Sequence, residues 1–303
     1  MGRGNRTLKL SGVFAAAVTP NRAGTLEADH SALLELMDFL ADGGVDGICL
    51  MGSTGEFVNY SSDERQRAVH LASKRSRVPV VVGVAHSSLT GALRLAGEAI
   101  ASGADGLLLM PPYFFPYRQP EIEAFYRAFM AELGTAVPVL LYNIPQFTSQ
   151  IHIETAQRLL DTGLFAGIKD SSGDWNYFEQ LLALRREREF ALFAGNDRIA
   201  LQALRAGADG VLSGCASAIP EILSRLYRTH VAGDCEGADS AHGSLMEFVE
   251  QIEQFPVPVG IKRAVQLRGQ KSGVPSVPLG PETQIALDRF EPWFREWASR
   301  SIG

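Results

Sequence analysis

The sequence predicts a (β/α)8 barrel that carries additional helices at its C-terminal end. Eight short apolar runs alternate with helical patterns, the order that a parallel sheet with crossover helices requires. A single barrel also accounts for most of a chain of 303 residues. We therefore expect one domain over residues 1–303, with the barrel at about 10–215 and C-terminal helices at 216–303.

Several of the predicted strands are apolar at every position, as strands buried on both faces must be. The strands are expected at 12–19, 47–52, 78–85, 106–111, 137–143, 165–170, 190–196 and 210–214. The intervening helices are expected at about 30–43, 61–76, 89–102, 119–134, 152–161, 174–187 and 198–206.

A weak internal repeat marks three of the connections from a helix to the next strand. Its three copies are Gly44-Val45-Asp46-Gly47, Gly103-Ala104-Asp105-Gly106 and Gly207-Ala208-Asp209-Gly210. Glycine tolerates positive φ at a helix end, and aspartate favours the tight turn that follows. The repeat has a structural explanation, so we expect no catalytic role for these glycines.

The alternation ends after residue 215, and the remaining chain has the pattern of packed helices. They are expected near 219–232, 235–254, 258–269 and 281–299. Trp293 and Trp297 are spaced i, i+4 on the last helix, which is more typical of a packing stripe than of a ligand site. The segment 273–280 is short and apolar, so we do not expect it to separate two domains.

Charge and hydropathy narrow the classes of function. Lys and Arg total 28 against 34 for Asp and Glu, a net charge of −6, and no stretch is strongly basic, so nucleic acid is not an expected partner. No apolar run reaches about 18 residues, so we expect no membrane span. Arg3, Arg6 and Lys9 before an apolar run loosely resemble a secretory signal, but we interpret that run as the first strand.

The cysteines and histidines predict neither a disulfide framework nor a metal site. Cys49, Cys215 and Cys235 are odd in number and far apart, which favours a reducing compartment, here the cytoplasm. The six histidines show no ligand spacing. We therefore expect no metal and no cofactor.

Lys169 is the leading candidate for catalysis, because it ends the apolar run that begins at Phe165. Burial disfavours the charged form of a lysine, and an uncharged amine attacks carbonyl carbon. Of five lysines, it alone ends a strand-like run in the alternating part of the chain. Taken alone, a lysine that snorkels at a sheet edge is an equal alternative.

Two more strand ends bring polar groups to the same mouth of the barrel. The second run ends in Gly52-Ser53-Thr54-Gly55-Glu56, whose hydroxyls and backbone N–H groups can hold a small carboxylate. A helix-capping turn is the alternative there. The fifth run ends in Tyr142-Asn143-Ile144-Pro145, where a phenol can relay protons or simply belong to the core.

The seventh and eighth runs end in Gly195-Asn196-Asp197-Arg198 and Ser213-Gly214-Cys215-Ala216. These ends can bind the distal part of a substrate or serve only as turns. Together the strand ends predict one mechanism, in which Lys169 forms an imine with a ketone, the hydroxyl-rich loop holds the adjacent carboxylate, and Tyr142 moves protons. The iminium accepts the electrons, so this chemistry requires no metal.

The ordered motifs Gly52–Glu56, Tyr142–Pro145 and Gly167–Lys169 resemble the dihydrodipicolinate synthase / N-acetylneuraminate lyase family over about residues 10–300. The resemblance implies a class I aldolase barrel, usually a homotetramer, that forms a Schiff base with pyruvate or another 2-keto acid. It implies Lys169 as the imine lysine and Tyr142 as the proton relay, with Thr54 in the catalytic set. The candidate substrate-binding residues are Ser53, Thr54, Gly55, Gly195, Asp197, Arg198, Leu212 and Ser213.

Departures from the family pattern bear on the substrate. Dihydrodipicolinate synthases carry an arginine where this chain has Phe147, and lend a neighbouring subunit a tyrosine where it has Phe114. Neuraminate lyases carry an acidic residue where it has Arg198, and a guanidinium there suits a second carboxylate. We therefore expect an aldolase that cleaves a 2-keto-3-deoxy sugar acid, or a similar 4-hydroxy-2-keto acid, to pyruvate and an aldehyde.

Three alternatives stay open. The first alternative is a dehydratase that acts through the same imine. The second is a 4-hydroxy-tetrahydrodipicolinate synthase of lysine biosynthesis. A protein of a different class would bind a keto acid without turnover, or hold phosphate or flavin at Gly195 and residues 213–214. The set Lys169, Tyr142 and Thr54 favours an enzyme, because binding alone needs no imine.

Overall fold

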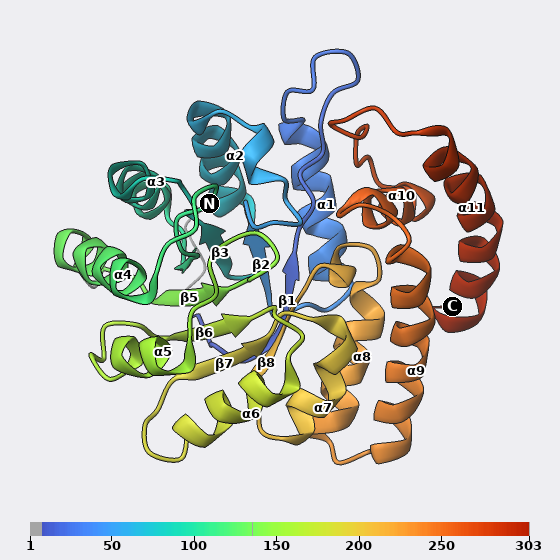
Figure 1. Ribbon diagram of the computed structural model, residues 1–303. Helices are drawn as coiled ribbons and strands as arrows, with labels where there is room; N and C mark the ends of the chain where they lie inside the picture. The colour runs from blue at the N-terminus through green and yellow to red at the C-terminus, as the bar shows by residue number, and fades with distance from the viewer. Residues whose placement is uncertain (1–7, 135, 303) are drawn as a thin grey trace.

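The computed structural model describes residues 8–134 and 136–302, and it confirms the predicted fold class (Figure 1). Eight parallel strands form a closed barrel in sequence order, and β8 pairs with β1. Helices surround the barrel, and the last three helices gather on one side of it (Figure 1). Arg3 and Arg6, which suggested a secretory signal, lie outside the described residues.

All eight predicted strands are present, and each is shorter than the apolar run that predicted it. They are β1 (Gly12–Ala16), β2 (Gly47–Leu50), β3 (Val80–Gly83), β4 (Gly106–Leu109), β5 (Val139–Asn143), β6 (Gly167–Asp170), β7 (Ala191–Ala194) and β8 (Gly210–Ser213). Every residue of these strands is buried, because the helices cover the outside and side chains fill the inside.

The predicted helices are also present, with boundaries that differ by three residues or fewer. Those that follow the strands are α1 (His30–Asp42), α2 (Ser62–Arg75), α3 (Leu89–Ser102), α4 (Gln119–Leu133), α5 (Ile153–Leu160), α6 (Trp175–Leu184), α7 (Ala200–Arg205) and α8 (Pro220–Val231). The C-terminal helices are α9 (Cys235–Ile252), α10 (Val259–Leu267) and α11 (Pro281–Ser301). Among the residues described, no helix is both long and apolar enough to cross a membrane.

The internal repeat has the structural role that its composition predicts. Its three glycines at the helix ends have φ between +83° and +104° (Gly44, Gly103 and Gly207). Its aspartates each accept a hydrogen bond from the backbone N–H at the start of an adjacent strand, at 2.7 to 2.8 Å (Asp46 from Val13, Asp105 from Val80, Asp209 from Leu192). The repeat therefore closes the N-terminal end of the barrel, opposite the candidate site.

The C-terminal helices pack through an aromatic stripe rather than around a ligand. The rings of Trp293 and Trp297 stack with centroids 5.7 Å apart, and Trp297 also stacks on Phe248 of α9 at 5.5 Å. This confirms the packing role predicted for the two tryptophans.

The strand register fixes which side chains share the barrel interior. Tyr142 of β5 is opposite Lys169 of β6, and Lys169 is opposite Phe193 of β7, so the three lie on the same side of the sheet. The Phe193 ring meets that of Phe14 on β1, the strand on the other side of β8, with centroids 5.3 Å apart. Lys169 and Tyr142 therefore extend inward, at the carboxyl end of their strands.

Candidate active site

Lys169 is buried at the mouth of the barrel rather than extended into solvent. Lys169 is only 4% exposed, and its Nζ lies 4.3 Å from the centre of the Tyr142 ring. A phenol face attracts an ammonium group and holds the amine in one direction. The snorkelling alternative does not fit this geometry, since the amine does not reach the surface.

The Tyr142 hydroxyl is hydrogen-bonded to a serine of the loop that follows β2. Its oxygen lies 3.0 Å from Ser53 Oγ, and either atom can donate. Thr54, which the sequence grouped with Lys169 and Tyr142, is buried and lies instead beside β8, because a Cβ built on Gly214 would be 3.0 Å from Thr54 Oγ1. The hydroxyl partner of the tyrosine is thus Ser53 and not Thr54.

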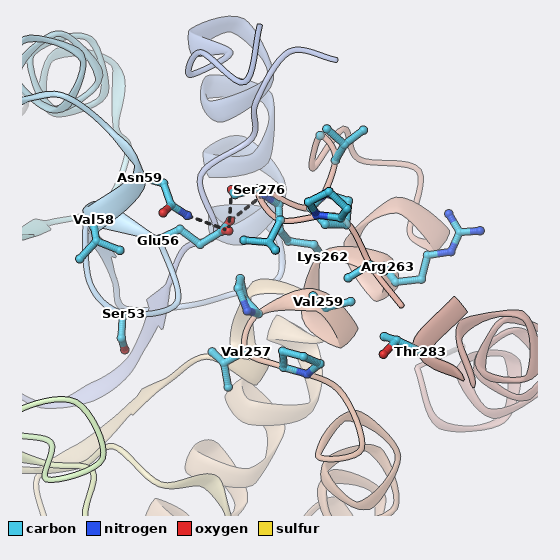
Figure 2. Close-up of a pocket in the computed structure, with 18 of the residues that line it drawn as sticks. Ser53, Glu56, Val58, Asn59, Val257, Val259, Lys262, Arg263, Ser276 and Thr283 are labelled. Carbon is cyan, nitrogen blue, oxygen red and sulfur yellow. Dashed lines mark hydrogen bonds and ion pairs between the residues drawn. The ribbon is translucent and has the colours of Figure 1, made fainter. Parts of the chain in front are cut away.

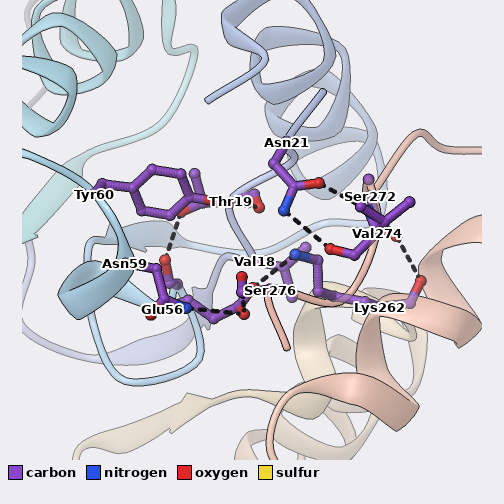
Figure 3. A network of polar contacts seen from close by, with 12 residues as sticks. Val18, Thr19, Asn21, Glu56, Asn59, Tyr60, Lys262, Ser272, Val274 and Ser276 are labelled. Carbon is purple, nitrogen blue, oxygen red and sulfur yellow. Dashed lines mark hydrogen bonds and ion pairs between the residues drawn. The ribbon is translucent and has the colours of Figure 1, made fainter. Parts of the chain in front are cut away.

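A buried ion pair holds the far end of this loop. Glu56 has φ of +52°, and its carboxylate accepts a 2.6 Å hydrogen bond from Lys262 Nζ on α10 and a 3.0 Å bond from Ser276 Oγ (Figure 3). The two charged side chains are 6% and 10% exposed. Lys262 was not among the predicted site residues, because a lysine on a helical pattern is usually exposed.

The segment 273–280 is bound to the loop that follows β1 (Figure 3). Asn21 donates to the Val274 carbonyl at 2.9 Å and accepts from the Val274 N–H at 2.7 Å. Nearby, Thr19 donates to the Gly55 carbonyl at 2.7 Å. Chain segments more than 200 residues apart in the sequence thereby fix the loop that carries Ser53.

The ends of β5 and β6 are braced by a buried amide and carboxylate. Asn143 Nδ2 donates to Asp170 Oδ1 at 2.7 Å, and Asn143 Oδ1 accepts from the Ile151 N–H at 3.0 Å. Burial raises the pKa of Asp170, while hydrogen bonds from Asn143 and Ser172 oppose that shift. The asparagine of the tyrosine motif therefore fixes the two strands that carry Tyr142 and Lys169.

Gly195 provides the space that the Lys169 stem occupies. A Cβ at Gly195 would lie 2.5 Å from Lys169 Cε and 2.1 Å from Ser171 Oγ, so any side chain there would displace both. Gly167 is required for a different reason: a Cβ there would lie 2.1 Å from the Ala191 carbonyl oxygen on the neighbouring strand β7. Of the two glycines, Gly195 is the one in direct contact with the lysine.

Asp197 and Ser213 lie on the same side of the mouth as the lysine. Desolvation raises the pKa of Asp197, hydrogen bonds with Ser213 and Cys215 oppose the shift, and the positive charge of Lys169 opposes it further. Leu212 is buried in β8, in register with Phe14, and belongs to the barrel interior.

The structure does not bring Arg198 to the site. Its Nε donates to Glu253 Oε1 at 2.7 Å, and its side chain is 46% exposed. Asp197 and Arg198 begin one short 3-10 helix (Asp197–Ile199), so the two neighbours point in different directions. The expected contact between Arg198 and a second carboxylate has no support in this geometry.

A cavity of about 1060 Å³ adjoins Ser53 and extends toward the C-terminal helices (Figure 2). Phe114 and Phe147 line it and are more than half exposed. Within the described ranges, no group of three or more His, Cys, Asp or Glu side chains is arranged to hold a metal ion.

Comparison with known proteins shows the family to which the chain belongs. The model of the dihydrodipicolinate synthetase family matches residues 9–293. A 4-hydroxy-tetrahydrodipicolinate synthase from Methanosarcina barkeri is 31% identical over 288 residues, which cover 94% of this chain and 97% of that protein.

Two solved structures illustrate the range of similar proteins. A dihydrodipicolinate synthase from Cyanidioschyzon merolae with lysine bound has a TM-score of 0.87 at 27% identity, over 96% of this chain and 98% of that one. A 2-keto 3-deoxygluconate aldolase from Picrophilus torridus has a TM-score of 0.83 at 26% identity, over 89% of this chain and 98% of that one.

Proposed function

The chain belongs to the dihydrodipicolinate synthetase family, and we propose that it cleaves a 2-keto-3-deoxy sugar acid or a similar 4-hydroxy-2-keto acid to pyruvate and an aldehyde. Members of this family are Schiff-base lyases and aldolases that use pyruvate, and the chain is an enzyme of that class. The observation that carries the proposal is the arrangement of buried Lys169 and Tyr142 with half-buried Ser53.

In the proposed reaction the Lys169 amine attacks C2 of the keto acid, and loss of water gives an iminium. The C3–C4 bond then breaks, and its electron pair forms the C2–C3 double bond of an enamine while the C4 hydroxyl loses its proton. The aldehyde leaves, and the enamine takes up a proton at C3. Water then hydrolyses the iminium and releases pyruvate and the free amine.

Tyr142 and Ser53 have the geometry to move the protons that these steps require. The phenol lies over the amine, and its oxygen is 3.0 Å from Ser53 Oγ, so a proton can pass from one hydroxyl to the other. We assign Ser53, Thr54 and Gly55 to the substrate carboxylate, and Gly195, Asp197 and Ser213 to the opposite side of the imine. These assignments are proposals.

A 4-hydroxy-tetrahydrodipicolinate synthase is the second candidate, because that is the name of the similar curated proteins. Phe147 and Phe114 stand where such synthases carry an arginine and a tyrosine, and neither phenylalanine binds a carboxylate. An assay with pyruvate and aspartate semialdehyde tests this reading. A dehydratase would instead release water from the same imine and leave the carbon chain intact.

Trapping with borohydride tests the imine itself. Borohydride added with pyruvate should reduce the iminium to a stable adduct, and peptide mass spectrometry should locate it on Lys169. Lys169→Ala should give no adduct and lose activity by far more than tenfold, while its circular dichroism stays that of the parent protein. Unmodified Lys169 in a folded protein, or activity of Lys169→Ala within about tenfold of the parent, would refute the proposal.

We also propose a homotetramer in the cytoplasm, on the family resemblance and on the three free cysteines. Sedimentation velocity would test the assembly. A species of about four times 32.8 kDa is expected, and a monomer at micromolar concentration would contradict it.

A further inference from the structure

The cavity beside Ser53 is larger than pyruvate needs. Its volume of about 1060 Å³ is at the upper end of the range for small-molecule sites. Ser53, the hydrogen-bond partner of Tyr142, lies on one side of it, and Thr283 of α11 lies on the other (Figure 2). The space thus begins beside Ser53, one hydrogen bond from Tyr142, and leads away from the barrel mouth, where the tail of a longer substrate would extend.

The walls of this cavity are mainly apolar. Its lining includes Val58, Phe147, Val257, Val259, Val277 and Leu279. Val58, Val257 and Val277 are 62%, 61% and 71% exposed, although valine is usually buried. Apolar groups exposed in a concave site gain free energy when an apolar ligand covers them.

The cations near this space are already paired. Lys262 is bound to Glu56, while Arg263 donates to Gln266 at 2.8 Å and forms an ion pair with Glu291. Among the described residues that line the cavity, no other lysine or arginine occurs. A carboxylate there would lose its hydration and gain no free cation in return.

We propose that this cavity binds the aldehyde-derived tail of the substrate and that the tail is apolar. The substrate class is then a 4-hydroxy-2-keto acid whose C4 carries an alkyl or aryl group, rather than a sugar acid or a dicarboxylic acid. The inference rests on the proposed function, because the cavity meets a reacting centre only if Lys169 forms the imine.

A series of aldehydes condensed with pyruvate tests the inference. The kcat/KM for acetaldehyde, butanal and hexanal should rise about two- to fourfold for each added methylene. Butanal should exceed 4-oxobutanoate, its carboxylate counterpart, by at least tenfold, and should exceed glyceraldehyde similarly. Borohydride trapping of pyruvate on Lys169 is measured on the same protein.

Two variants and a matched control locate the tail. Val257→Asn should flatten the dependence on chain length, whereas Val231→Asn should keep it, because Val231 is a valine of similar exposure (65%) on α8 outside the cavity lining. Phe147→Arg should shift the preference toward 4-oxobutanoate, because it adds an unpaired cation to the wall.

The outcomes separate the inference from the proposed function. A pyruvate adduct on Lys169 combined with a flat aldehyde series, or with a preference for 4-oxobutanoate or glyceraldehyde, would overturn the apolar tail alone. A chain-length dependence that survives Val257→Asn as fully as Val231→Asn would overturn the placement in this cavity. No adduct on Lys169 would overturn the proposed function and this inference with it.

Discussion

Tyr142 can act on the proposed imine only because backbone pairing places it next to Lys169. The two residues are opposite each other on β5 and β6, so their separation depends on the strand register and not on a mobile loop. Ser53, by contrast, reaches the phenol from a loop. The lysine and the phenol are therefore the rigid part of the site, and the serine depends on whatever holds its loop.

Removing the phenol oxygen should slow proton transfer and spare the imine. Tyr142→Phe keeps the ring that faces the amine but loses the hydroxyl bonded to Ser53, so turnover should fall by about a hundredfold or more. Steady-state kinetics measures the loss, and borohydride trapping shows that pyruvate still reaches Lys169. An unchanged rate would remove Tyr142 from the mechanism.

Gly195→Ala should displace the Lys169 amine, which we propose to form the imine. The added methyl would meet Lys169 Cε at 2.5 Å, so the lysine stem must move, and a displacement of about 1 Å at a reacting group can cost about a hundredfold in rate. Imine formation with pyruvate measures the effect. Gly97→Ala in α3 is the control, because nothing lies within 4 Å of its Cβ and alanine favours the helix. Equal rates in the two variants would contradict the prediction.

The residues at the strand ends could be predicted from the sequence, but the contacts that their side chains make could not. A lysine after an apolar run is visible in the sequence, and so is a tyrosine after another. The pairing of Tyr142 with Ser53 rather than Thr54 depends on a turn in which Met51 has φ of +56°. The exposure of Arg198 was not predictable either, since one residue of rotation in a short helix decides whether a side chain points inward.

At the scale of elements, the C-terminal helices support the loop that carries Ser53 and Glu56. Helix α10 supplies Lys262 to Glu56, and the segment 273–280 supplies Ser276. This support was not predictable from periodicity, which locates α10 but says nothing about which face meets a loop 200 residues earlier. Helices and strands were predictable because local spacing encodes them, whereas their contacts are long-range.

Breaking the buried ion pair should destabilise the protein and loosen the loop. Lys262→Met leaves the Glu56 carboxylate buried with only hydroxyl and amide partners, so the free energy of unfolding should fall by roughly 3 kcal/mol. The KM for pyruvate should rise as well, because Ser53 and Glu56 share one loop. Urea denaturation and kinetics measure the two effects.

The control for this prediction is an ion pair on the surface. Arg205→Met breaks the pair with Asp239, whose side chains are 45% and 60% exposed, and should cost less than about 1 kcal/mol. A similar loss of stability in Arg205→Met and Lys262→Met would show that burial does not set the cost. A normal KM in Lys262→Met would separate the ion pair from pyruvate binding.

The two ends of the barrel have different roles: the N-terminal end contributes to stability, and the C-terminal end carries the candidate site. Three Gly-x-Asp-Gly turns close the N-terminal end of the barrel by hydrogen bonds to backbone N–H groups. The opposite end carries the polar strand ends and the cavity, as in other barrels of this architecture. Substitutions in the repeat should therefore change stability without a selective effect on pyruvate binding.

We expect three histidines to make the stability of the whole molecule depend on pH. Burial is the largest cause that lowers the pKa of His30, His86 and His242 below the usual 6.5. Below that pH the unfolded chain takes up protons that the folded protein resists, so stability is lost as pH falls from about 7 to 5.5. Urea denaturation at both pH values measures this loss.

A variant in which glutamine replaces all three histidines measures how much they contribute to the loss of stability between pH 7 and 5.5. The variant should lose less stability between pH 7 and 5.5 than the parent, because glutamine takes up no proton. Asp170 and Asp197 act in the opposite direction, since burial raises the pKa of each carboxyl and protonation then favours the folded state. Both aspartates are present in parent and variant, so their effect cancels in the comparison. An identical pH dependence in the two proteins would assign the loss to other groups.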